Sequence, residues 1–277
     1  MACGFSALDT ISMKLEDIAV ILVQPMGPVN VGSVCRAMMN FGFSDLRLVN
    51  PCRDFKNTAD ARKMALGAIS LLEHARCYKN LESALKDCNT AFGTTRRIGK
   101  YRKNLLNPEQ AGNKISVLED CHKCALVLGR EDNGLSSDEL ELCQHFVTIP
   151  TDDAFASMNL SHALCIFAYE ISKAVKNVRK KNQCQDTGNI ENRTCSDIQK
   201  SISQTNQNNL PADISELEMM YSHMKKTLSD INFLDPQNPD HLLRTFRRIF
   251  GRSGLSSRDV RIIRGLMSRM DWINAQL

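Results

Sequence analysis

The sequence predicts an α/β domain with a mostly parallel sheet, followed by a small helical appendage. From residue 17 to residue 176, short apolar runs alternate with amphipathic segments, as in parallel sheets with crossover helices. Beyond a polar stretch, residues 211–277 contain only helical patterns. We therefore expect a disordered lead at 1–16, the α/β domain at 17–176, a flexible polar linker at 177–210 and a basic helical domain at 211–277.

Five short apolar runs predict buried strands, because each ends at or near Gly, Pro or Asn. They are IAVILV at 18–23, LRLVN at 46–50, TAFGT at 90–94, ALVLG at 125–129 and FVTIP at 146–150.

Amphipathic segments between these runs predict helices at 31–41, 59–72, 81–88 and 138–143. Ser136 and Glu139 have the spacing of a capping box for the last of them. A longer helix at 159–175 closes the domain, with apolar residues at helical spacing on one face. Residues 214–229, 241–252 and 256–273 predict three more helices, and the last two are the most basic part of the chain.

Composition sets broad limits on function. The 277 residues are 43% hydrophobic and 24% charged, with a formal net charge of +4. This mild excess permits nucleic-acid binding without arguing for it. The chain has eleven cysteines, but its start has no apolar signal-peptide core and no run reaches the roughly 18 residues of a membrane span. We expect reduced thiols, a cytoplasmic location and no membrane contact.

Three clusters of polar residues follow predicted strands, at 24–43, 126–140 and 149–170. Open α/β sheets bind ligands at these strand ends. The first cluster lacks both G-x-G-x-x-G and the Walker pattern, so dinucleotide and P-loop binding are excluded. Each cluster also has a plain structural interpretation: Asn30 as a helix N-cap, 129–134 as a polar turn, and Ser157 or Asn159 as an N-cap.

Taken together and in order, the clusters resemble the motifs of a known family. The matching pieces are Asn30-x-Gly32-Ser33-x-x-Arg36-Ala37, LRLVNP at 46–51, Gly129-Arg130-Glu131 with Gly134-Leu135, SMNL at 157–160 and AYE at 168–170. They resemble the SPOUT superfamily of RNA 2'-O-methyltransferases, TrmH class, and most closely its TrmJ family. The resemblance implies a SPOUT (α/β knot) domain with a deep C-terminal trefoil knot; it continues more weakly through FRRIF and RIIRG in the C-terminal helices.

The resemblance implies a homodimeric enzyme that methylates the ribose 2'-hydroxyl of tRNA at anticodon-loop nucleotide 32 (Cm32/Um32). S-adenosyl-L-methionine is the implied methyl donor and S-adenosyl-L-homocysteine the product. Methylation of rRNA or of another tRNA position is the alternative, and a catalytically silent RNA-binding module is a third. No metal is expected, because the C-x-x-C at Cys121 and Cys124 lacks a second ligand pair.

The resemblance also implies which residues of this chain form the catalytic and cofactor-binding sites. The catalytic set is Arg36, Asn30, Glu131, Ser157 and Asn159. The cofactor-binding set is Thr94, Thr95, Arg96, Gly129, Ile149, Ala156, Ser157, Met158 and Leu160.

A basic run directly after the strand at 90–94 predicts contacts with RNA phosphates, because that strand end carries expected cofactor positions. Its residues are Arg96, Arg97, Lys100, Arg102 and Lys103. Arg36 is expected to anchor a phosphate and stabilise alkoxide charge. A guanidinium with a pKa above about 12 is a poor base at neutral pH.

Overall fold

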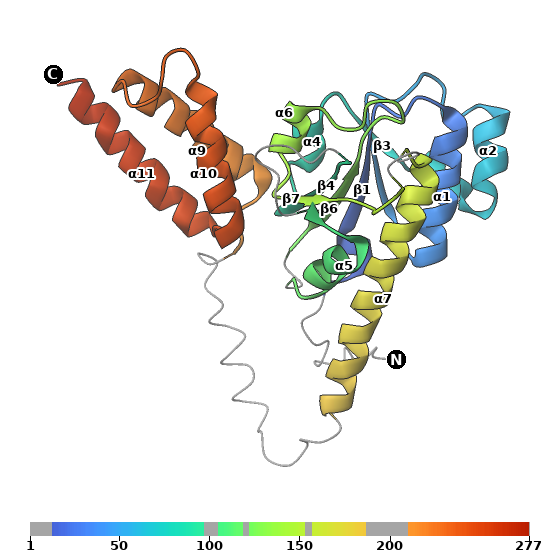
Figure 1. The fold of residues 1–277 in the computed structure, drawn as a ribbon. Helices are drawn as coiled ribbons and strands as arrows, with labels where there is room; N and C mark the ends of the chain where they lie inside the picture. Colours follow the sequence, from blue (N-terminus) through green and yellow to red (C-terminus); the bar gives the residue numbers. More distant parts are fainter. Residues whose placement is uncertain (1–12, 97–104, 119–121, 153–156, 187–209, 277) are drawn as a thin grey trace, which may run out of the picture.

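The computed structural model describes residues 13–96, 105–118, 122–152, 157–186 and 210–276. Within them the chain forms an α/β domain and a bundle of helices at the C-terminus (Figure 1). In the described part of the chain, no helix is long and apolar enough to cross a membrane.

The sheet has seven strands in the order β3-β2-β1-β6-β4-β7-β5, and every neighbouring pair is parallel. The strands are β1 (Ile18–Val23), β2 (Asp45–Val49), β3 (Arg76–Tyr78), β4 (Thr90–Thr94), β5 (Leu105–Leu106), β6 (Cys124–Leu128) and β7 (His145–Val147). The five predicted strands are confirmed. The two edge strands β3 and β5 were not predicted, since runs of three and two residues show no periodicity.

The two faces of the sheet are covered by helices of the same domain (Figure 1). The helical segments are η1 (Leu15–Asp17), α1 (Pro28–Phe41), α2 (Ala59–Ala65), η2 (Leu66–Ala68), α3 (Ile69–Glu73), α4 (Leu81–Leu85), α5 (Pro108–Ser116), α6 (Ser137–Glu141) and α7 (Leu160–Asp186). Helices α1, α5 and α7 pack on one face, and α4 and α6 on the other. All six residues of β1 are buried, as expected for a strand covered on both faces.

Several helix predictions need correction. The predicted helix at 59–72 is broken at Leu66, whose φ of 40° is incompatible with a continuous right-handed helix. The N-cap of α1 is Gly27, with Pro28 in the first turn, so the N-cap interpretation of Asn30 is wrong. Helix α5 was not predicted. Helix α7 continues to Asp186, so residues 177–186 are helical and not linker. The Ser136–Glu139 capping box is confirmed.

One glycine allows two helices of the site region to approach closely. A Cβ on Gly32 of α1 would lie 2.2 Å from the carbonyl oxygen of Ala61 in α2. Such a distance leaves no room for a side chain, so α1 and α2 can pack at this spacing only with glycine at position 32.

The C-terminal bundle contains α9 (Ile214–Asp230), α10 (Pro239–Ser253) and α11 (Ser257–Asn274) around its own apolar core. It is anchored to the α/β domain. Ile214 is buried in the core cluster beneath α4 and α6, and its N–H donates to the carbonyl of Cys88 at 2.8 Å. Asn89 Nδ2 donates to the carbonyl of Pro211 at 2.9 Å, and Arg244 pairs with Glu141 at 2.6 Å.

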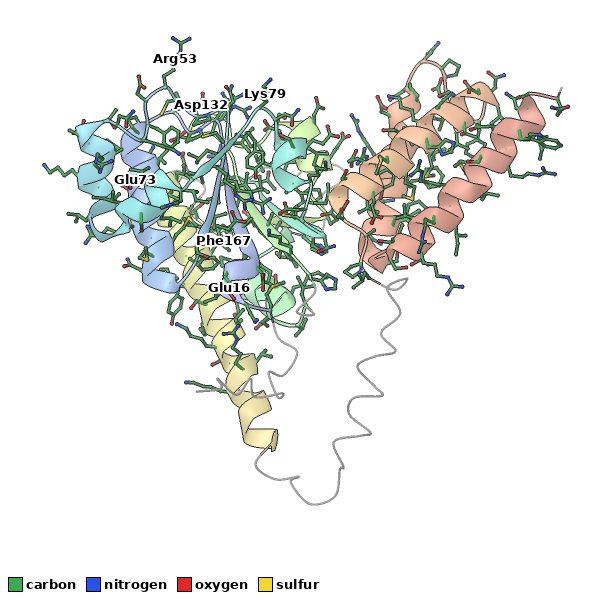
Figure 2. The ribbon with its side chains drawn as sticks, turned by 180° about the vertical axis from the view of Figure 1, so that it is seen from behind. Glu16, Arg53, Glu73, Lys79, Asp132 and Phe167 are labelled. Carbon is green, nitrogen blue, oxygen red and sulfur yellow. The ribbon has the colours of Figure 1, made fainter. Side chains whose placement is uncertain are left out.

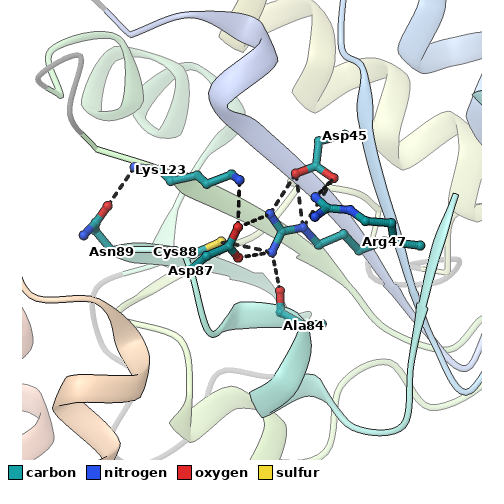
Figure 3. A network of polar contacts seen from close by, with 8 residues as sticks. Asp45, Arg47, Ala84, Asp87, Cys88, Asn89 and Lys123 are labelled. Carbon is teal, nitrogen blue, oxygen red and sulfur yellow. Dashed lines mark hydrogen bonds and ion pairs between the residues drawn. The ribbon is translucent and has the colours of Figure 1, made fainter. Parts of the chain in front are cut away.

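A buried arginine ties β2 to α4 near this junction (Figure 3). The side chain of Arg47 is fully buried between two carboxylates, donating to Asp45 at 2.8 Å and to Asp87 at 3.0 Å. Lys123 adds a second cation to Asp87 at 2.7 Å. Burial opposes ionisation of both carboxyls, but their hydrogen bonds to Arg47 prevail and hold the pKa values below the ordinary range. The network is therefore ionised at neutral pH.

Candidate active site

Side chains from all three sequence clusters meet at the carboxyl edge of the sheet. The Glu131 carboxylate accepts a hydrogen bond from the N–H of Met26 at 3.0 Å and from Asn30 Nδ2 at 2.7 Å. Asn30 Oδ1 in turn accepts from Asn159 Nδ2 at 3.2 Å. These bonds connect residues more than 100 positions apart. We call the three hydrogen-bonded residues Asn159, Asn30 and Glu131 the polar trio.

Local structure explains how each member of the trio is placed. Asn30 lies in the first turn of α1, which a short loop connects to the end of β1. Asn159 precedes α7, and its Oδ1 accepts from the N–H of Ser161 at 2.9 Å, as an N-cap does. Asn159 thus serves the helix with its oxygen and Asn30 with its nitrogen.

Glu131 belongs to a tight ring formed by residues 129–134. The N–H of Gly134 donates to the carbonyl of Arg130 at 2.9 Å, and the N–H of Arg130 donates back at 3.3 Å. A Cβ on Gly129 would lie 2.2 Å from the carbonyl carbon of Gly134, so only glycine fits there. Figure 2 shows Asp132 of this ring at the same end of the domain as Lys79, just after β3. The ring therefore lies at the carboxyl edge.

The expected cofactor positions follow the neighbouring strands β6, β4 and β7. Gly129 is buried directly after β6, Thr94 is half-buried at the end of β4, and Ile149 lies half-buried just beyond β7. The N–H of Thr95 donates a hydrogen bond to the carbonyl of Val147 at 2.9 Å. Neighbouring parallel strands thus bring these positions to one edge of the sheet.

The remaining cofactor positions lie around the start of α7 or at the strand end. Leu160 is buried and packs in the core cluster with α1, while Met158 is half-buried. Arg96 and Ser157 are exposed, and Ala156 lies outside the described residues. Of the expected RNA contacts, Arg97, Lys100, Arg102 and Lys103 also lie outside the described residues.

The expected catalytic set is only partly gathered in a single chain. Asn30, Glu131 and Asn159 are joined, but within the described residues no hydrogen bond or ion pair connects Arg36 or Ser157 to them. Arg36 is exposed on α1. Six residues of α-helix separate it from Asn30, about 9 Å along the axis and about 120° around it. The catalytic role of Arg36 stays a prediction.

Sequence reasoning placed Gln24 and Met26 in the cluster at 24–43 but did not identify the contacts of the Met26 N–H or of the Gln24 side chain. Gln24 has a left-handed φ of 48° at the end of β1, which is rare for a non-glycine residue. A main-chain donor and a backbone angle leave no residue-type signal, so no sequence pattern could have identified either one.

Comparison with known proteins defines the class. The sequence profile of the SpoU rRNA methylase family matches residues 17–169, so the chain belongs to that family. The profile of the tRNA methyltransferase TrmJ C-terminal domain matches residues 215–276. The α/β domain is accordingly of the SPOUT methyltransferase type. The expected trefoil knot stays a prediction, because segments 97–104, 119–121 and 153–156 lie outside the described residues.

Particular relatives narrow the class to TrmJ. The chain is 38% identical over 255 residues to the tRNA (cytidine/uridine/adenosine-2'-O-)-methyltransferase TrmJ of Pseudomonas aeruginosa, covering 92% of this chain and 93% of that protein. It is 31% identical to the Klebsiella pneumoniae TrmJ, over 94% and 98% of the two chains. The crystal structure of TrmJ from Zymomonas mobilis superposes with a TM-score of 0.71 at 30% identity, covering 91% of this chain and 98% of that one.

Proposed function

We propose that this chain is a cytoplasmic enzyme that methylates the ribose 2'-hydroxyl of tRNA, using S-adenosylmethionine, at anticodon-loop nucleotide 32. The observation that carries the proposal is the polar trio, which joins three strand-end loops in a SpoU methylase domain. The TrmJ-type C-terminal domain and the names of the full-length relatives support tRNA as the substrate.

The residues at the carboxyl edge fit an adenosyl group. Ile149 and Leu160 pack against the core and offer apolar surface, while Thr94 and the 129–134 ring offer polar atoms beside it. Small-molecule sites combine apolar walls with a few placed polar groups in this way. Thr94, Gly129, Ile149 and Leu160 would hold the donor, which supplies a methyl group made electrophilic by the positive sulfur to which it is bonded.

The protein must orient the ribose hydroxyl and stabilise the negative charge that develops on it. The polar trio fixes the loops on which this alignment depends, and alignment is the largest demand of a displacement at carbon. The planar guanidinium of Arg36 anchors the neighbouring phosphate and stabilises the alkoxide. The hydroxyl proton leaves to phosphate or water, because a guanidinium is fully protonated at neutral pH.

We propose that the enzyme acts as a homodimer through the outer face of α1. Val29 and Arg36 lie on one face of this helix, seven residues apart. Val29 is 42% exposed, Met39 46% and Tyr169 of α7 53%. A second copy seated on this apolar surface would cover it and bring Arg36 of one protomer to the trio of the other. Arg36 would then act in the partner's site, which explains its distance from the trio of its own chain.

Ribose methylation of rRNA or of another tRNA position is the second candidate, because the matching family is described by rRNA substrates. A catalytically silent RNA-binding module is the third. The TrmJ-type C-terminal domain favours tRNA over rRNA. The intact Asn30, Glu131 and Asn159 favour an enzyme over a silent module.

The test is a methylation assay on the full chain. The protein is incubated with labelled S-adenosylmethionine and either unmodified total tRNA or rRNA, and the 2'-O-methylated position is mapped by nuclease resistance. Label at nucleotide 32 of tRNA supports the proposal. Label only in rRNA, or at another tRNA position, overturns the stated target. Absence of methyl transfer to any RNA overturns the enzymatic function.

A further inference from the structure

Arg130 connects the 129–134 ring to the end of β1. Its Nε donates to Gln24 Oε1 at 2.7 Å. Gln24 is the residue whose φ of 48° turns the chain out of β1. Residues in such sparsely populated conformations persist only where the surroundings hold them, and they cluster at functional sites.

The rest of the Arg130 guanidinium binds the start of α6. Its Nη1 and Nη2 donate to the two oxygens of Glu139 at 3.0 and 2.8 Å, and Nη1 also reaches the carbonyl of Gly134 at 3.2 Å. Glu139 is itself fixed by the capping box, in which it accepts from the N–H of Ser136 at 2.7 Å. The side chains of Arg130 and Glu139 are only 21% and 17% exposed. A planar, two-pronged pair with this burial is among the stronger protein contacts.

Adjacent residues therefore hold the ring from two directions. Glu131 reaches the N–H of Met26, just before α1, and Asn30 in α1. Arg130 reaches Gln24 and Glu139. We propose that Arg130 is a positioning residue that fixes the shape of the 129–134 ring for the methyl donor, through Gln24 and Glu139. This inference rests on the proposed function and assigns a residue outside the catalytic and cofactor sets.

The expected consequence is on donor binding. The ring begins and ends with glycine, which has more backbone freedom than any other residue type. Gly134 has a positive φ of 69°. Without the Arg130 contacts, the ring must be ordered when the donor binds, and that cost weakens affinity. Once donor and tRNA are both bound, the ring is ordered again. The KM for the donor should therefore rise more than kcat falls.

A matched control exists in the C-terminal bundle. Arg247 forms the same two-pronged pair with Glu218, and these side chains are 24% and 15% exposed. The pair joins α9 to α10, and neither of its hydrogen bonds involves the 129–134 ring. Arg247→Met thus removes a comparable ion pair at comparable burial without touching the ring.

The experiment measures S-adenosylmethionine binding by calorimetry in the absence of RNA, for the wild type, Arg130→Met, Arg130→Lys and Arg247→Met. We expect the dissociation constant to rise about tenfold in Arg130→Met and to stay at the wild-type value in Arg247→Met. Arg130→Lys should resemble Arg130→Met, because lysine keeps the charge but lacks the planar fork. Steady-state kinetics on tRNA should show the rise in donor KM with kcat within about threefold of wild type and tRNA KM unchanged.

Two results separate this inference from the proposed function. If the wild type and Arg130→Met bind the donor with the same affinity, the positioning role alone is overturned. The same holds if Arg247→Met loses as much donor affinity as Arg130→Met. A wild type that binds no donor overturns the proposed function and this inference with it. If Arg130→Met does not fold by circular dichroism, Gln24→Met removes only the bond to Nε. Its expected effect is a rise of about threefold in the dissociation constant, and no rise overturns the proposal.

Discussion

Asn30 is the residue on which the active-site account depends most, because it is the middle member of the polar trio. Replacing it with alanine removes one hydrogen bond to the Glu131 carboxylate, at 2.7 Å, and one to Asn159, at 3.2 Å. A hydrogen bond to a charged group contributes about 2 kcal/mol. If that contribution is made in the transition state, kcat/KM falls about 30-fold. Asn30 is only half-buried, so the melting temperature should change little.

The assay is methyl transfer to an unmodified tRNA transcript, with thermal melting of the same samples. Asn30→Asp provides a second variant, since a carboxylate there faces Glu131. Like charges raise the pKa of one member of such a pair. The Asn30→Asp enzyme should therefore be least active at neutral pH and partly recover in mildly acidic buffer, where a shared proton restores the contact. An Asn30→Ala enzyme with wild-type kcat/KM would refute the reasoning.

Three further predictions concern other parts of the chain. Arg36→Lys should lose most turnover at saturating tRNA, because lysine lacks the planar fork; near-full turnover would contradict the anchoring role. Arg47→Met leaves Asp45 and Asp87 with only Arg76 and Lys123 as cationic partners and should cost about 3 kcal/mol, lowering the melting temperature by about 10 °C. Arg62→Met, in an exposed pair, should change the melting temperature by at most a few degrees. Burial lowers the pKa of His145 from 6.5 to about 4, so the unfolded state takes up the proton first as pH falls between those values. The free energy of unfolding should therefore be about 1.4 kcal/mol lower at pH 5.5 than at pH 7.5 because of this histidine. Denaturant titrations of His145→Phe at the two pH values should lack that difference.

Much of the α/β domain could be predicted because parallel strands buried on both faces have continuous apolar runs. The strand at 18–23 matches β1 at both ends, and the strand at 90–94 matches β4. The α7 stripe was equally clear, because Leu164, Phe167 and Ile171 are buried at helical spacing. The end of α7 was not, since the sequence after Val175 has no apolar stripe to mark it.

The candidate site was predictable in its components and not in its geometry. The order of the motifs identified Asn30, Glu131 and Asn159, and the structure joins them. Their pairing could not be read from residue types, because it depends on where strands β1 and β6 become neighbours. Rotation along α1 separates Arg36 from Asn30. The spacing of six residues already places the two side chains on different faces once the segment is known to be a helix.

The central claim is that the strand-end segments 24–36, 129–134 and 149–159, of which 153–156 lie outside the described residues, hold one ligand together. Hydrogen–deuterium exchange of the full chain with and without S-adenosylmethionine tests it most directly. Slower exchange in all three segments upon donor addition, with no change in 214–274, is the predicted result. Protection confined to one segment, or found only in the C-terminal bundle, would contradict the claim.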